Sequence, residues 1–187
     1  VINKPLDEDV LMETVRTIFE HGWLNLKMYF MIGLPTETME DVQAIIDLGS
    51  KVHKIGMSIA GNRVHIHLGI STFIPKAHTP FQWYPMDTPE NIQTKLDLLK
   101  RGARQAHLKM TYNLPEASQV ESWLSRGDRR LGAVILQAWR NGAKFDAWSE
   151  HLNLQAWQDA FARVGLDSGF YTLRQRSLDE VLPWDHI

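Results

Sequence analysis

Helical patterns alternate with short apolar runs three times along this chain, and this alternation constrains the fold more than any other feature. The clearest apolar run, 26–32, is interrupted only by Lys27, which is typical of a strand buried on both faces of a parallel sheet. Weaker strand patterns cover 63–74 and 108–114. The order αβαβαβ joins parallel strands by right-handed crossovers, so the sequence predicts an α/β fold.

Capping residues mark the predicted helix boundaries. Asp7 can accept hydrogen bonds from the first amides of the first helix, and Gly22 follows that helix as a stop. Thr38 is a good N-cap for the second helix, with Asp41 three residues on as a partial capping box. We expect the second helix to end at Gly56.

The pattern changes after Pro115, where strands give way to helices joined by short loops. Helical patterns are predicted over 117–125, 128–140 and 154–164. We therefore divide the chain into an α/β part, 1–115, and a helical extension with a tail, 116–187. The last segment, 169–187, has a mixed pattern that predicts a weakly ordered tail.

Composition and charge narrow the class of protein. Hydrophobic residues make up 44% and charged residues 22%, which suffices for a packed core and argues against disorder. The net charge of −2 gives no support to a dedicated nucleic-acid binder. No apolar run approaches the roughly 20 residues of a membrane span, and no secretory signal precedes the first helix. We expect a cytoplasmic protein without a membrane partner.

The chain contains no cysteine. Disulfides, thiolate nucleophiles and Cys-ligated zinc or iron–sulfur clusters are therefore excluded within these residues. The sequence also begins at Val1–Pro5 without an initiator Met and stops abruptly at Trp184–Ile187. These features together predict that the chain is an excised piece of a longer protein.

The turn after the 26–32 strand is the first candidate binding site. Gly33 permits a close approach of backbone to a ligand, and the helix amides at 38–41 could meet an anion. The alternative is a plain strand-to-helix turn, in which Gly33 and Pro35 serve only geometry.

The loop that follows the 63–74 strand is the second candidate. Residues 71–83 combine two prolines, Lys76, His78 and three aromatic rings at the same edge of the predicted sheet. The alternative is that Phe73, Phe81 and Trp83 only plug the end of a barrel.

His65 and His67 alternate with apolar residues, so both project from one face of the predicted strand. Two imidazoles at this spacing could ligate a metal or transfer protons. We favour a polar stripe inside a barrel or on a half-exposed face, because no third ligand lies beside them.

Residues 126–130 read Arg-Gly-Asp-Arg-Arg and form a further candidate. Three guanidinium groups near a helix start could grip phosphate or nucleic acid. The more common arrangement has Asp128 as an N-cap and the arginines solvated or ion-paired.

Residues 30–42, Phe-Met-Ile-Gly-Leu-Pro-Thr-Glu-Thr-Met-Glu-Asp-Val, resemble the fifth strand and following turn of radical S-adenosylmethionine (SAM) enzymes. Residues 73–83, 125–130 and 182–187 look like a narrower group in that superfamily, which carries an N-terminal region of cobalamin-binding type. The resemblance covers most of the chain.

The resemblance implies the C-terminal half of a partial (βα)₆ TIM-like barrel with parallel strands, followed by a helical extension. SAM would lie across the C-terminal ends of the strands. By position, the residues that would contact it are Met31, Ile32, Gly33, Phe73, Ile74, Pro75 and Lys76. No residue is assigned a catalytic role or a metal. Glu37 lies one position later than the motif glutamate of the family.

The [4Fe–4S] cluster of the family is held by a three-cysteine motif on the first barrel loop, which this chain lacks. The resemblance therefore implies an iron–sulfur oxidoreductase as the parent protein, with SAM, the cluster and, as a further candidate, cobalamin as cofactors. The chain alone would be an inactive fragment whose partner is the missing N-terminal half.

Two further hypotheses stay open. A non-catalytic α/β interaction or oligomerisation domain could pair with the missing half or with itself, because half a barrel exposes strand edges and apolar faces. An RNA-directed module finds no support in the net charge. Within the first hypothesis, we expect Lys76 rather than His65 to contact the ligand.

Overall fold

The computed structural model describes residues 7–186 and has the α/β architecture that the sequence predicts. The chain divides into two compact units. The first contains the described residues up to Ser71 together with Asn91–Tyr112, and the second contains Thr72–Glu90 and the described residues from Asn113 onward. The sequence-based boundary at 115 lies close to residue 113, where the chain enters the second unit for the last time. The segment Thr72–Glu90, assigned to the α/β part from sequence, groups with the second unit.

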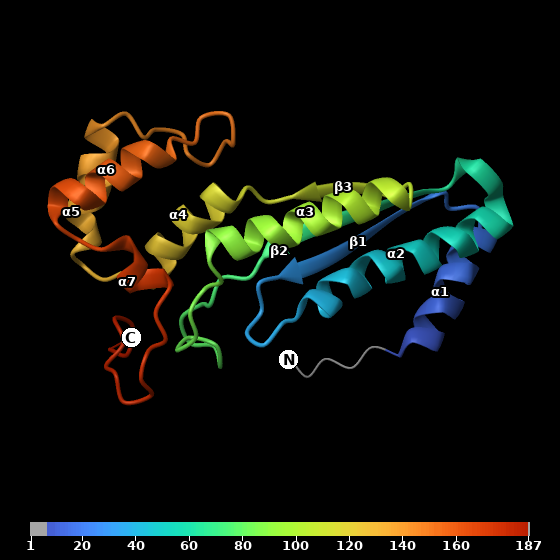
Figure 1. The fold of residues 1–187 in the computed structure, drawn as a ribbon, viewed down its shortest axis with the longest axis horizontal. Coiled ribbons are helices and arrows are strands. Elements are labelled where there is room, and N and C mark those ends of the chain that lie inside the picture. Colours follow the sequence, from blue (N-terminus) through green and yellow to red (C-terminus); the bar gives the residue numbers. More distant parts are fainter. Residues whose placement is uncertain (1–6, 187) are drawn as a thin grey trace. The chain divides into compact units, whose positions relative to one another are not determined.

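The first unit is built on a parallel sheet of three strands in the order β1-β2-β3 (Figure 1). Its elements are α1 (Glu8–Glu20), β1 (Asn25–Ile32), α2 (Met39–Ala60), a 3₁₀ turn (Gly61–Arg63), β2 (His65–Thr72), α3 (Pro89–Gln105) and β3 (Lys109–Tyr112). All three predicted strands are therefore present: β1 begins one residue earlier than predicted, and β2 and β3 are shorter at both ends. In the β2–β3 register, His67 lies opposite Lys109 and Gly69 opposite Thr111.

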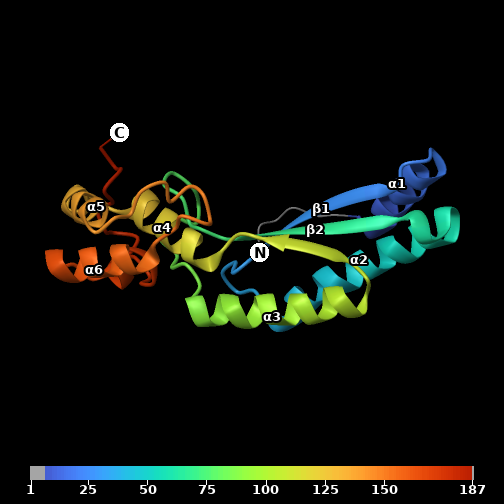
Figure 2. The ribbon, with the colours of Figure 1, turned by 90° about the horizontal axis from the view of Figure 1, so that it is seen from above.

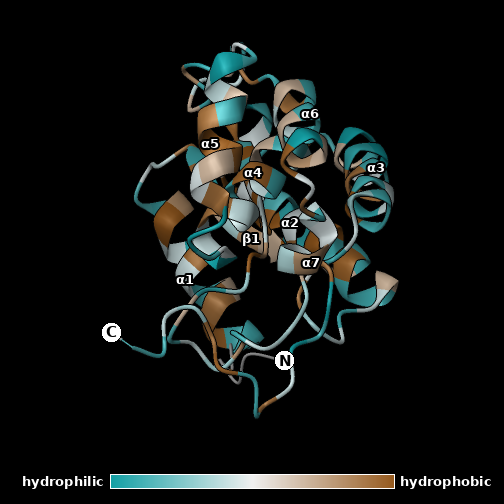
Figure 3. Ribbon diagram, turned by 90° about the vertical axis from the view of Figure 1, so that its left-hand side faces the viewer, coloured by the Kyte–Doolittle hydropathy of each residue, from teal (hydrophilic) through white to brown (hydrophobic). Residues whose placement is uncertain are grey.

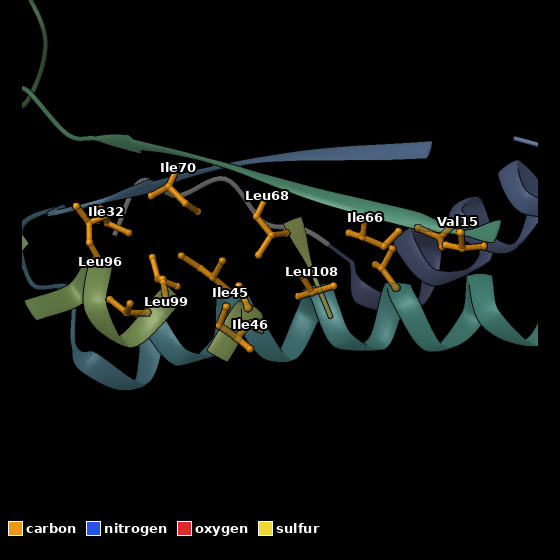
Figure 4. Packing of buried hydrophobic residues seen from close by; sticks show 14 of the residues in the cluster. Val15, Ile32, Ile45, Ile46, Ile66, Leu68, Ile70, Leu96, Leu99 and Leu108 are labelled. Carbon is orange, nitrogen blue, oxygen red and sulfur yellow. The ribbon is translucent and has the colours of Figure 1, made fainter. Parts of the chain in front are cut away.

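Both crossover helices, α2 and α3, lie on the same side of the sheet (Figure 2). The main core fills the space between them and the strands, as Figure 4 shows. Ile66, Leu68 and Ile70 of β2 point toward the helices and are buried there. Each such side chain contributes about 1.5–3 kcal/mol on full burial, so this layer accounts for much of the stability of the unit.

The predicted N-terminal caps of the first two helices are confirmed. Asp7 accepts hydrogen bonds from the backbone N–H groups of Asp9 and Val10. Thr38 and Asp41 form a complete capping box at the start of α2. Each side chain satisfies an amide that would otherwise lack an intrahelical partner.

The prediction that Gly56 ends the second helix is wrong. Helix α2 continues to Ala60, and Gly56 is buried within it. A Cβ at this position would lie 2.7 Å from Val64 Cγ1 and 2.9 Å from Phe19 Cζ. The missing side chain therefore lets α1 and the start of β2 pack closely against α2, a role that helix-stop rules do not detect.

The second unit is helical where the sequence predicts helices. It contains α4 (Pro115–Arg126), α5 (Leu131–Arg140), α6 (Leu154–Val164) and α7 (Ser168–Thr172). Hydrophobic and hydrophilic residues are mixed along these helices (Figure 3). Their apolar faces surround a second core that includes Trp123, Trp157 and Phe161.

The prediction of a weakly ordered tail over 169–187 is wrong for the described part. Arg176, Leu182 and Trp184 are buried, and Trp184 Nε1 donates a hydrogen bond to Gln82 Oε1 over 2.7 Å. After α7 the described tail forms no helix or strand, and its sequence pattern is therefore mixed. The side chains of Arg176 and Trp184 nevertheless anchor it. Val1–Pro5 and Ile187 lie outside the described residues. In the described part of the chain, no helix is long and apolar enough to cross a membrane.

Candidate functional site

The turn after β1 is a compact, hydrogen-bonded structure around Gly33. This glycine is buried and has φ of +83°, a conformation that side chains with a Cβ rarely adopt. Its N–H donates to Glu37 Oε1 over 2.9 Å, so the glutamate side chain folds back over the turn. The next residues, Leu34 to Thr38, lead directly into the capped start of α2.

Glu37 is the centre of a buried ion pair. Its carboxylate oxygen Oε1 lies 2.7 Å from Lys95 Nζ, and the two side chains are only 6% and 9% exposed. Lys95 projects from α3, so the pair ties the turn after β1 to that crossover helix. Removing one partner of an ion pair that is shielded from water in this way lowers the stability of the fold strongly, because the other charge is left buried and unpaired. The sequence suggested no role for Lys95.

The three candidate SAM contacts on β1 and its turn differ in accessibility. Met31 is 46% exposed, whereas Ile32 is completely buried in the core beneath the helices (Figure 4). Ile32 and Gly33 can therefore offer a ligand only backbone groups, and Met31 is the accessible side chain of the three.

No residue of the described range 7–186 covers the sheet face opposite α2 and α3, and we call this face the open face. Its members alternate with core residues along the strands. They are Lys27, Tyr29, Met31, His65, His67, Gly69, Ser71, Lys109 and Thr111. Tyr29 is 76% exposed and lies over Gly69, where a Cβ would come within 3.0 Å of its Cδ1 atom.

The two strand histidines lie on this open face. His65 is exposed, and His67 Nε2 lies 2.9 Å from Thr111 Oγ1 on the neighbouring strand. This arrangement is the half-exposed polar stripe that the alternation favours. Within residues 7–186, no group of three or more metal-ligating side chains comes together.

The candidate residues after β2 belong to the second unit. Phe73, Ile74 and Pro75 are buried, and Phe73 stacks edge-on against Phe81 with ring centroids 5.3 Å apart. Lys76 is exposed and forms an ion pair with Glu121 of α4. The loop is thus packed into its unit, and Lys76 is the member with an accessible charge.

Arg126 holds this loop from within. Its side chain is completely buried and donates to the carbonyl oxygens of Pro75 and Tyr171, over 3.2 and 3.0 Å. Burial, together with the nearby guanidinium of Arg176, lowers the pKa of Arg126 to about 10. Arg126 is therefore a structural group, neither solvated nor ion-paired as its motif suggested. The motif gave no signal of burial because arginine is rarely a core residue.

Arg130 is ion-paired with Asp128, as expected, but the prediction that Asp128 is a helix N-cap is wrong, because Arg130 occupies the N-cap of α5. Asp128 Oδ1 accepts a hydrogen bond from the backbone N–H of Arg130 over 2.9 Å, just before α5 begins. The Arg130 guanidinium donates to the same carboxylate, and this hydrogen bond holds the pKa of Asp128 below its usual value.

Comparisons with known proteins place few limits on this site. No family model matches the chain, and no solved structure matches it. The uncharacterized protein MJ0966 of Methanocaldococcus jannaschii is 26% identical over 134 residues, which is 72% of this chain. The aligned segment is 28% of that protein, so the chain spans less than a third of the length of this relative. Because that protein is uncharacterized, the similarity transfers no activity.

Proposed function

We propose that this chain is part of a larger radical SAM enzyme and forms one wall of its partial (βα)₆ barrel. In this proposal, the rest of the barrel covers the open face, and SAM is bound at the C-terminal ends of the strands. The motif resemblance at 30–42 and 73–83 suggests the superfamily, and the geometry of the sheet supports the barrel.

The open face is the observation that carries the proposal. Parallel sheets are normally covered on both faces, whereas the described part of this chain covers the sheet on one face. The strands also follow one another in chain order with both crossover helices on one side, which is the winding of a barrel wall. A doubly wound sheet would instead reverse its strand order and carry helices on both faces. The length of the archaeal relative is in line with a larger protein.

The residues fit SAM better than they fit an iron–sulfur cluster. Gly33 offers backbone groups in a positive-φ turn without a Cβ in the way, and Met31 offers an exposed apolar side chain two residues before it. Bound SAM would supply an activated sulfonium group. The chain has no thiolate, so it cannot hold the cluster, and cluster ligands belong to the rest of the protein in this proposal.

Within this chain, the Glu37–Lys95 pair positions the SAM-binding backbone. Glu37 holds the N–H of Gly33, and Lys95 holds Glu37, so both side chains act on the ligand through the turn. The capping box at Thr38 fixes where α2 starts and therefore where the turn ends.

SAM titration of the complete gene product by isothermal calorimetry tests the proposal. Gly33→Ala should weaken SAM binding at least tenfold, because a Cβ strains the turn that presents the backbone. Gly22→Ala is a matched control, since Gly22 has φ of +86° and open space around it. The control should leave SAM affinity unchanged. Absence of SAM binding to the complete protein, or equal losses in both variants, would contradict the proposal.

A second candidate function, an oligomerisation domain, is favoured by the same open face. The exposed aromatic ring of Tyr29 and the side chain of Met31 give this face an apolar centre that a second copy could cover. Analytical ultracentrifugation of the chain with and without Tyr29→Glu distinguishes the two functions. A dimer that Tyr29→Glu dissociates, together with no SAM binding by the complete protein, would favour oligomerisation.

A further inference from the structure

The second unit contains a pocket of about 600 Å³ that none of the preceding proposals uses. It is lined by Gly127, Asp128, Arg129, Arg130, Pro183 and His186. Its volume falls within the range of about 300–1,000 Å³ that is usual for small-molecule sites. Two guanidinium groups and an imidazole face one carboxylate, so the lining has an excess of cationic and hydrogen-bond-donating groups.

The guanidinium of Arg129 has no partner among the residues that the structure describes. Its side chain is exposed, and no hydrogen bond or ion pair involves it anywhere in residues 7–186. Most surface arginines gain little from an ion pair, but an unpaired one on the wall of a pocket keeps all five N–H donors for a ligand.

Arg130 is held in place instead. Asp128 accepts from its Nε and Nη2 atoms over 3.1 and 2.7 Å. The guanidinium carbon also lies 5.7 and 5.8 Å from the ring centroids of Phe170 and Tyr171. These contacts fix the orientation of the guanidinium and leave its Nη1 atom without an acceptor among residues 7–186. Less conformational entropy is then lost when a ligand binds.

A buried hydroxyl adjoins the two charged side chains of this wall. It belongs to Tyr171, whose residue is 1% exposed, and it interacts with the side chains of both Asp128 and Arg130. Tyr171 therefore helps to hold these two side chains in the wall of the pocket.

The helix N-terminus beside the pocket does not explain the arrangement. The first amides of α5, from Leu131 to Ala133, already donate to the carbonyl oxygens of residues 128–130. The donors available to a ligand are therefore side chains, and their fork geometry matches tetrahedral and planar oxyanions.

We propose that this pocket binds the terminal phosphate of a phosphorylated small molecule. Arg129 and Arg130 would each donate to the phosphate, with His186 at the rim and the Tyr171 hydroxyl behind Arg130. Two guanidiniums match the two negative charges of a phosphate monoester better than the single charge of a carboxylate or phosphodiester. The site is one pocket rather than a basic stripe, which favours a small molecule over a nucleic-acid strand.

Calorimetric titration of the chain with adenosine 5′-monophosphate, adenosine and a short RNA with a 5′-hydroxyl tests this inference. We expect the monophosphate to bind with a dissociation constant below about 1 mM and the other two not to bind. Arg129→Gln should weaken monophosphate binding about tenfold. Arg140→Gln is the matched control, because Arg140 is exposed at the C-terminal end of α5, away from the pocket. This variant should leave the affinity for the monophosphate unchanged.

No binding of the monophosphate, equal binding of the RNA, or equal losses in Arg129→Gln and Arg140→Gln would each overturn the inference.

Discussion

Replacing Lys95 by methionine removes the cation of the buried ion pair while keeping most of the volume of the side chain. Glu37 is then left 6% exposed with a single described donor, the N–H of Gly33. Breaking a buried pair from one side costs about 3–5 kcal/mol. The remaining backbone hydrogen bond places the expected loss near the lower end, about 3 kcal/mol.

For a chain of this length, 1 kcal/mol shifts the unfolding temperature by about 2–4 °C, so Lys95→Met should lower Tm by about 6–12 °C. Urea unfolding followed by circular dichroism gives the free energy directly. The control is Lys51→Met, because Lys51 pairs with Glu8 at the surface, where both side chains are more than half exposed. That variant should leave the unfolding midpoint essentially unchanged.

The double variant Lys95→Met with Glu37→Leu completes the test. It replaces both charges by apolar groups, which is often neutral for a buried pair, so most of the lost stability should return. Equal midpoints for Lys95→Met and Lys51→Met would refute the reasoning, because they would mean that water reaches the Glu37 carboxylate.

Three further predictions concern other parts of the chain. Gly56→Ala should destabilise by about 1–2 kcal/mol in urea unfolding because its Cβ would meet Val64 at 2.7 Å. Gly132→Ala, with nothing within 4 Å of its Cβ, should stabilise α5 by up to about 1 kcal/mol. Arg174 donates a hydrogen bond to Glu180 and lowers the pKa of that carboxyl, so Glu180→Gln should cost about 1 kcal/mol at pH 7 in urea unfolding. The cost should shrink as the pH falls through the lowered pKa of Glu180, because the carboxylate is then protonated.

Local sequence rules predicted the elements of this fold well where short-range chemistry decides them. The apolar run before Gly33 forms strand β1, and Thr38 with Asp41 forms the predicted cap. The prediction that this strand is buried on both faces is wrong, because Tyr29 and Met31 are exposed on one of them. Local rules also failed at Gly56, because its role depends on a side chain from α1 that lies more than thirty residues away in the chain.

In the candidate site, too, sequence neighbours decide some features and distant residues decide others. The position of Gly33 in a strand-to-helix turn follows from its neighbours in sequence. The ion pair between Glu37 and Lys95 does not, because the two residues are 58 positions apart and meet only through the crossover of α3. Arg126 was noticed as a motif member, but its burial depends on acceptors from the 75–82 loop and α7, which no local pattern relates to it.

The central claim is that the rest of a larger protein covers the open face. Hydroxyl-radical footprinting of the complete gene product measures this directly, because Met31 and Met39 oxidise by the same chemistry. Met31 lies on the open face and is 46% exposed, whereas Met39 starts α2 and is 37% exposed. If the open face is covered, Met31 should be strongly protected from oxidation in the complete protein, while Met39 should react as it does in this chain. Equal oxidation of the two methionines in the complete protein would contradict it.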